Sequence, residues 1–196
     1  MVSRTEVKFI SFEAYNKPMR IVQINSSSGG SPGMLMHAIS ARLKEEGIEN
    51  YNLFTAGTSS FSNDICYSDP IRIKLNALRS RVTGNYGFVS RDSTKKLLSL
   101  LDHMKPDLIQ LHVIHGHDFN LESFFQYVKD RNIPVVYTFH DCWAFTGDCP
   151  HYSMIHCDQW KTCCEHCPLY KRYSWFHDHS SSNYLRKNPP YPLWII

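Results

Sequence analysis

The sequence predicts an α/β fold with a doubly wound parallel sheet of the Rossmann-like kind, and two observations support this prediction. Short apolar runs rich in β-branched residues alternate along the chain with segments whose apolar residues recur at a helical period. The turns between these segments are short, as strand–helix–strand units of a parallel sheet require. The chain has 196 residues, of which 42% are hydrophobic and 20% charged, which is the size and composition of one globular domain.

The first unit follows an expected N-terminal extension, residues 1–18, and begins with an apolar strand at 19–25. The strand runs into 26–33, Ser-Ser-Ser-Gly-Gly-Ser-Pro-Gly, whose small residues permit a tight turn. Ser31 precedes a proline, which suits a helix N-cap followed by the first helical position. Apolar residues then recur near the 3.6 period over 34–43, so a helix is expected there.

The next segments predict one strand and two helices. A strand is expected at 51–55, a polar loop at 57–68 and an amphipathic helix at 71–82. A further helix is expected at 93–104, with Asp92 as its cap. The helix expected at 71–82 carries four basic residues, which are expected on a solvated face rather than in a binding patch. They are Arg72, Lys74, Arg79 and Arg81.

Two further strands end in polar residues. A strand at 108–113 runs into Ile-His-Gly-His-Asp, a helix is expected at 119–131, and a strand at 135–139 runs into His140. Parallel strands present their carboxyl ends at one edge of the sheet, where open α/β folds bind ligands. The sequence therefore predicts that the glycines after the first strand, His115 and His140 meet at this edge.

Charge and hydropathy limit the kinds of partner that the protein can bind and where it can be located. The net charge is +3 and no stripe of Lys and Arg is visible, which argues against nucleic acid but allows weak attraction to anionic lipid head groups. Residues 1–18 lack the apolar core of a secretory signal, and no apolar run approaches the length of a membrane span. We therefore expect a cytoplasmic protein that can lie peripherally at the inner face of the plasma membrane.

The turn after the first strand is a candidate anion site. Gly29, Gly30 and Gly33 lie where backbone N–H groups at a helix start can face a diphosphate. The same pattern is also typical of a simple tight connection between a strand and a helix.

Six of the seven cysteines lie between Cys142 and Cys167. In the cytoplasm, where we expect this protein, thiols stay reduced. The spacing favours a structural zinc site, although free buried cysteines are an alternative. The expected ligands are Cys149, Cys157, Cys164 and Cys167.

Three phrases resemble a known enzyme family. They are Lys-Pro-Asp-Leu-Ile-Gln-Leu-His at 105–112, His-Gly at 115–116 and Val-Tyr-Thr-Phe-His-Asp-Cys-Trp-Ala-Phe-Thr-Gly at 136–147, and the match continues through the cysteines to Pro168. These strings resemble retaining family 4 glycosyltransferases, in particular the subgroup of colanic-acid, capsule and O-antigen synthesis.

The resemblance implies the GT-B architecture, in which two Rossmann-like domains face each other. Residues 19–187 then correspond to the N-terminal, acceptor-side domain, with a Cys-rich loop at 142–168 and an irregular tail at 188–196. The Glu-x7-Glu segment of the donor-binding domain is not in the sequence. We therefore expect a truncated enzyme that is inactive alone.

The resemblance also implies roles for individual residues. The three glycines would approach the phosphates of a UDP- or GDP-sugar, and His140 would contact the transferred sugar. Asp141 would orient the imidazole of His140 or bond the acceptor, and His115 would line the acceptor side. The acceptor would be a lipid-linked or free saccharide, and no catalytic metal is expected.

Two other functions remain open at this point. The first is a metal-dependent hydrolase that uses a His/Asp cluster around one or two ions. Its ligands would be His112, His115, His117, Asp118, His140 and Asp141. The second is a non-catalytic acceptor-binding module, which could pair with a separate donor-binding chain.

Overall fold

The computed structural model describes residues 18–187 and 193–195, so the predicted extension before Pro18 lies outside the described residues. Its strands are β1 (Arg20–Ser27), β2 (Glu49–Ala56), β3 (Asp64–Cys66), β4 (Leu108–Leu111), β5 (Val135–Tyr137) and β6 (Leu193–Ile195). Its helices are α1 (Gly30–Glu45), α2 (Pro70–Thr83), α3 (Arg91–Met104), α4 (Leu121–Asp130) and α5 (Ser180–Lys187). Short 3-10 helices lie at Trp143–Phe145, Tyr152–Ile155, Gln159–Lys161 and Tyr170–Arg172.

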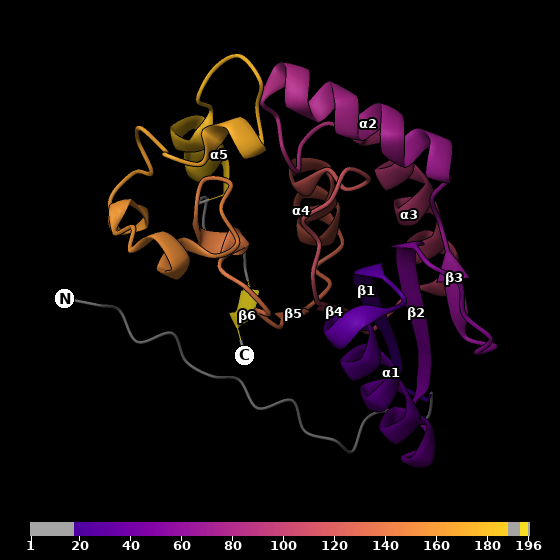
Figure 1. The fold of residues 1–196 in the computed structure, drawn as a ribbon. Coiled ribbons are helices and arrows are strands. Elements are labelled where there is room, and N and C mark those ends of the chain that lie inside the picture. The colour runs from indigo at the N-terminus through magenta and orange to yellow at the C-terminus, as the bar shows by residue number, and fades with distance from the viewer. Residues whose placement is uncertain (1–17, 188–192, 196) are drawn as a thin grey trace.

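The strands form one sheet in the order β3-β2-β1-β4-β5-β6, and every neighbouring pair is parallel. Helices flank this sheet, while the Cys-rich loop and α5 form a lobe beside β5 (Figure 1). The α/β Rossmann-like prediction is therefore confirmed. The strand order reverses direction between β1 and β4, which is the topological switch point of such sheets.

Residues on β1 alternate between two different environments. Val22 and Ile24 are fully buried in the apolar cluster that contains Leu97 of α3 and Phe124 of α4. Gln23 points the other way and donates a hydrogen bond to the carbonyl of Met36 in α1, at 3.0 Å. One face of the sheet is thus a conventional apolar core, while the face under α1 contains buried amides.

Some local predictions were wrong. The polar segment 57–68 contains the short edge strand β3, whose backbone pairs with β2 despite its composition. The predicted irregular tail contains β6, which pairs with β5 over three residues, and the rest of that tail lies outside the described residues. The helix α5 was not expected at all.

Both proposed helix caps were also wrong. The N-cap of α1 is Gly29 rather than Ser31, and Gly30 takes a left-handed backbone with φ +71° that favours glycine. The N-cap of α3 is Ser90, and Asp92 lies in the first turn instead. An acidic side chain there still interacts favourably with the helix dipole.

The prediction that the basic residues of α2 face solvent was confirmed, since Arg72, Lys74 and Arg79 are exposed, but its apolar residues do not form a buried face. The side of α2 that packs on the protein carries small and polar residues such as Asn76 and Ser80. Its large apolar residues face outward instead, with Ile71 71% exposed. None of the helices among the described residues has the length and apolar character needed to cross a membrane.

The close approach of α1 to the end of β1 gives the first testable prediction. A Cβ on Gly33 would overlap the carbonyl oxygen of Ser28, whereas a Cβ on Gly116 would meet only the Ser26 side chain at 4.0 Å. We expect Gly33→Ala to lower the free energy of unfolding by about 1–3 kcal/mol because the backbone must shift. Urea denaturation is the measurement, and Gly116→Ala is the matched control with little change. Equal stability of the two variants would contradict the packing described.

Candidate functional site

The candidate site lies where β1, β4 and β5 end side by side. The amide of Ser26 donates to the carbonyl of Val113 at 2.7 Å, and the amide of Thr138 donates to the carbonyl of Leu111 at 2.9 Å. These bonds continue the parallel pairing past the strand ends. They bring the glycine turn 29–33, the segment 112–118 and the segment 138–141 to one edge of the sheet, as the sequence predicted.

A chain of hydrogen bonds from inside the protein holds His140. Gln23 uses its amide nitrogen to donate to Oδ1 of Asn52 at 3.0 Å, so its oxygen is left to accept from Nε2 of His112, also at 3.0 Å. The other ring nitrogen of His112, Nδ1, then accepts from Nε2 of His140 at 3.0 Å. This pattern fixes both tautomers and leaves Nδ1 of His140 as the ring nitrogen available to a ligand.

Burial keeps these imidazoles neutral. Burial, with a smaller repulsion from His140, lowers the pKa of His112 from 6.5 to about 4. Burial also lowers the pKa of His140, although the carboxylate of Asp141 opposes this effect. At neutral pH the pair is therefore an uncharged donor and acceptor system rather than a cation.

A second pair lies next to the first. Nε2 of His115 is 2.6 Å from Oδ2 of Asp141, and Nδ1 of His115 is 3.2 Å from the hydroxyl of Tyr86. The other oxygen of Asp141 accepts from the amide of Trp143 at 2.8 Å. Asp141 therefore orients His115, and the expectation that it orients the ring of His140 was wrong, since His112 does so.

Neighbouring groups stabilise the ionised form of Asp141. Burial favours the neutral acid, but the hydrogen bond and charge of His115 and the amide of Trp143 outweigh it and hold the pKa of Asp141 below its usual value. The edge thus presents a fixed carboxylate near the neutral imidazoles of His112 and His140.

The glycine turn opens α1 at the same edge. Gly29 and Gly30 are exposed, and Gly33 packs against the backbone of residues 27 and 28. The first turn of α1 contains no acidic residue, and no side chain caps it. The amide of Gly29 donates to Oγ of Ser27 at 3.2 Å, so an anion would meet the following N–H groups of the first turn and the positive helix end.

The geometry does not support the alternative hypothesis of a metal-dependent hydrolase. Asp118 is buried and accepts from Ser68 at 2.6 Å, Asn76 at 2.7 Å and Ser93 at 3.2 Å, so its role is structural. Among the residues that the structure describes, no group of three or more His, Cys, Asp or Glu side chains is arranged to hold a metal ion. His117 is directed elsewhere, toward the ring of Tyr86.

The four predicted zinc ligands share one small cavity. Cys149, Cys157, Cys164 and Cys167 line a space of about 20 Å³, and all seven cysteines of the chain are free thiols. Their sulfurs do not form a metal-binding arrangement as they stand. Burial raises the pKa of Cys149 and of Cys164, and raises that of Cys167 to about 11, so these groups are neutral thiols at pH 7.

Helix α5 holds the Cys-rich loop against the domain through polar contacts. The buried ammonium of Lys187 donates to the carbonyls of Trp143 at 2.9 Å, Thr146 at 3.3 Å and Gly147 at 2.7 Å. It also lies 3.5 Å from the centre of the Trp143 ring. Asn183 adds a bond to the buried carboxylate of Asp148 at 2.9 Å. The position of Asp141, two residues before Trp143, therefore depends on α5.

Three supporting residues were missed by the sequence reasoning. Gln23 could have been found, because it is a lone amide within an apolar strand. Tyr86 and Lys187 gave no signal, because their partners are distant in the sequence and come together only through the fold.

No protein-family model matches the chain. The comparison with curated proteins likewise gives no significant match. Fold and site geometry therefore remain the basis for assigning a function.

The pKa of His112 gives a prediction for stability. Its folded value of about 4 lies below the ordinary 6.5, so on acidification the unfolded chain takes up the proton first. We expect the free energy of unfolding to fall between pH 6.5 and 4, with about 3 kcal/mol of the loss due to this residue. In His112→Asn that part of the pH dependence should disappear.

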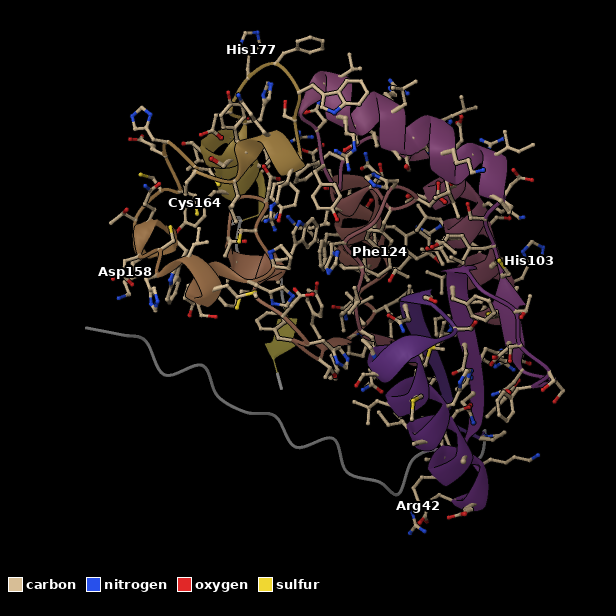
Figure 2. The ribbon with its side chains drawn as sticks, viewed as in Figure 1. Arg42, His103, Phe124, Asp158, Cys164 and His177 are labelled. Atoms are coloured by element: carbon tan, nitrogen blue, oxygen red, sulfur yellow. The ribbon has the colours of Figure 1, made fainter. Side chains whose placement is uncertain are left out.

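Urea denaturation at several pH values is the measurement, and only the slope against pH is compared because His112→Asn also removes two hydrogen bonds. His103→Asn, at an exposed position on α3 (Figure 2), is the matched control and should keep the wild-type slope. A slope unchanged by His112→Asn would contradict the neutral buried ring.

Proposed function

We propose that this chain is the acceptor-side domain of a retaining glycosyltransferase of surface polysaccharide synthesis. It would help to transfer a sugar from a UDP- or GDP-sugar to a lipid-linked or saccharide acceptor. One observation carries the proposal: the glycine turn and two oriented pairs, His112–His140 and His115–Asp141, lie at the switch point of the sheet. The resemblance of residues 136–147 to family 4 glycosyltransferases supports the same assignment.

Such a transfer needs an oriented hydroxyl and a stabilised leaving diphosphate. Neutral His140 offers Nδ1 to a sugar hydroxyl, and its ring cannot rotate freely because His112 holds the opposite nitrogen. The N–H groups at the start of α1 would meet diphosphate charge. His115, held between Tyr86 and Asp141, would line the acceptor side.

The remaining donor contacts are assigned to a separate donor-binding domain or chain. The carboxylate described at this edge, Asp141, is paired with His115 and is not assigned to the nucleotide ribose. We expect the isolated chain to bind nucleotide-sugars weakly and to show no measurable transfer. A chain that binds acceptor without transfer would be the non-catalytic module considered above.

We also propose that the four thiols around the small cavity bind a structural zinc ion. The supporting observation is that all four side chains line one small cavity, in a loop that has no regular strand or long helix. Zinc binding would displace the thiol protons and draw the sulfurs to about 2.3 Å from the ion. The ion would stabilise the loop that carries Trp143 and Asp141.

Nucleotide-sugar binding tests the proposed function. On titration of the chain with UDP- and GDP-sugars, we expect NMR shifts at the amides of Gly29, Gly30 and Gly33 and at the ring of His140. His140→Ala should weaken binding about threefold to tenfold, the effect of one hydrogen bond. His103→Ala is the control and should bind like the wild type. Shifts confined to another surface, or full affinity in His140→Ala, would refute the assignment.

Zinc content tests the second proposal. Protein prepared without chelator should contain about one zinc per chain, and Cys164→Ser should lose it, because a hydroxyl is a poor zinc ligand. The neighbouring Cys163, which does not line the cavity, supplies the control variant Cys163→Ser, and this variant should keep the metal. A zinc-free wild type whose melting temperature is unaffected by chelator would end the proposal.

A further inference from the structure

Helix α2 exposes the face that most helices bury. Its large apolar residues are spaced at i, i+4, i+7 and i+11, so they form one stripe along the helix. We name this set the α2 stripe, and its members and exposures are Ile71 71%, Leu75 62%, Leu78 50% and Val82 44%.

The opposite face of α2 supplies the contacts with the domain. Asn76 donates to the buried carboxylate of Asp118 at 2.7 Å, and Ser80 is fully buried. At 100° per residue both lie on the side of the helix opposite to the α2 stripe. The stripe is therefore not a misplaced core face, since α2 is held by polar contacts while its apolar face remains in contact with solvent.

Basic side chains border the α2 stripe on both sides. By helical geometry Arg72 and Arg79 flank one side of it, and Lys74 and Arg81 flank the other. The helix itself contains no acidic residue, and Asp69 at the N-cap is the nearest carboxylate in its sequence. An apolar stripe between two rows of cations is typical of helices that lie in a membrane interface.

A groove beside α2 continues the positive charge. It has a volume of about 520 Å³, and Arg72 and Arg79 line it from α2 while Arg91 and Lys95 line it from α3. The carboxylate that lines it, Asp92, lies 3.5 Å from Arg72 in an exposed ion pair. The groove could therefore take a phosphate head group next to the apolar stripe.

Two exposed aromatic residues extend the apolar surface at the C-terminal end of α2. The amide of Trp175 donates to the carbonyl of Arg81 at 2.9 Å, which fixes this loop against the helix. Trp175 is 49% exposed and Phe176 is 62% exposed. Their neighbour His177 lies at the same upper side of the molecule as α2 (Figure 2). Aromatic side chains of this kind anchor proteins at the membrane–water interface.

We propose that the α2 stripe, its basic borders and the Trp175–Phe176 loop dock this protein on an anionic lipid membrane. The surface is complementary to an anionic membrane in polarity and charge. Its apolar side chains match acyl chains, and the cations on both sides match lipid phosphates. The docking is peripheral, with α2 parallel to the membrane plane.

The docking surface is independent of the proposed transfer chemistry. It contains none of the residues of the candidate site, so a variant such as His140→Ala should bind membranes like the wild type. Failure of membrane binding and failure of nucleotide-sugar binding are therefore separate results.

Vesicle flotation with the full chain tests the proposal. The protein should float with vesicles of phosphatidylcholine and phosphatidylglycerol, and much less with phosphatidylcholine alone. The double variant Leu75→Gln/Leu78→Gln should weaken binding on the order of 100-fold, because two large apolar side chains no longer enter the membrane. Arg72→Gln/Arg79→Gln should weaken binding to anionic vesicles about 30-fold and reduce its dependence on salt.

Met154→Gln is the control, since Met154 is 78% exposed on the Cys-rich loop and outside the docking surface. It should float like the wild type, and all variants should keep the wild-type circular dichroism and melting temperature because each changed residue is exposed. The proposal is overturned if the wild type does not float with anionic vesicles. It is also overturned if Leu75→Gln/Leu78→Gln abolishes a dimer in solution without affecting flotation, since the stripe would then bind a second copy.

Discussion

The buried hydrogen-bond chain from Asn52 through Gln23 and His112 to His140 determines where the candidate site can form. Its members come from β2, from β1 and from the ends of β4 and β5, so it requires the register of three strand pairs at once. A slip of one residue would turn Gln23 into the apolar face and leave buried polar groups without partners. The same chain that stabilises the α1 face of the sheet therefore positions the imidazole that faces a ligand.

A second set of buried polar contacts, made by Lys187, holds the Cys-rich loop that follows β5. Burial lowers the pKa of Lys187 and the charge of Asp148 opposes this, while three loop carbonyls accept from the ammonium. Loops of this length without regular strands seldom bury enough apolar surface to order themselves. Here Trp143 enters the core and Lys187 closes over it, so residues 141–149 are held from two sides. The position of Asp141 thus depends on a helix that begins 39 residues later in the sequence.

The alternation of strands and helices and the placement of His115 and His140 at a shared edge could be predicted, because hydrophobic period and parallel topology are encoded locally. The pairing of Asp141 with His115 could not, since neighbours in sequence suggested His140 and only the end of β4 brings His115 closer. Helix α2 shows a different limit. Its period revealed two faces, but periodicity does not say which one is buried, and the acceptor Asp118 for Asn76 is 42 residues away.

The orientation of α2 also connects the outer surface with the edge of the sheet. Asp118, which holds α2 through Asn76, follows His117 by one residue, and Tyr86, shortly after α2, bonds His115. The docking surface and the candidate site therefore share their supporting segments, 84–90 and 114–118, and lie at the same end of the strands (Figure 1). A membrane held against α2 would keep lipid-linked molecules near His115 and His140 and raise their local concentration. The proposed docking would thus let the proposed lipid-linked acceptor reach the candidate site without leaving the membrane.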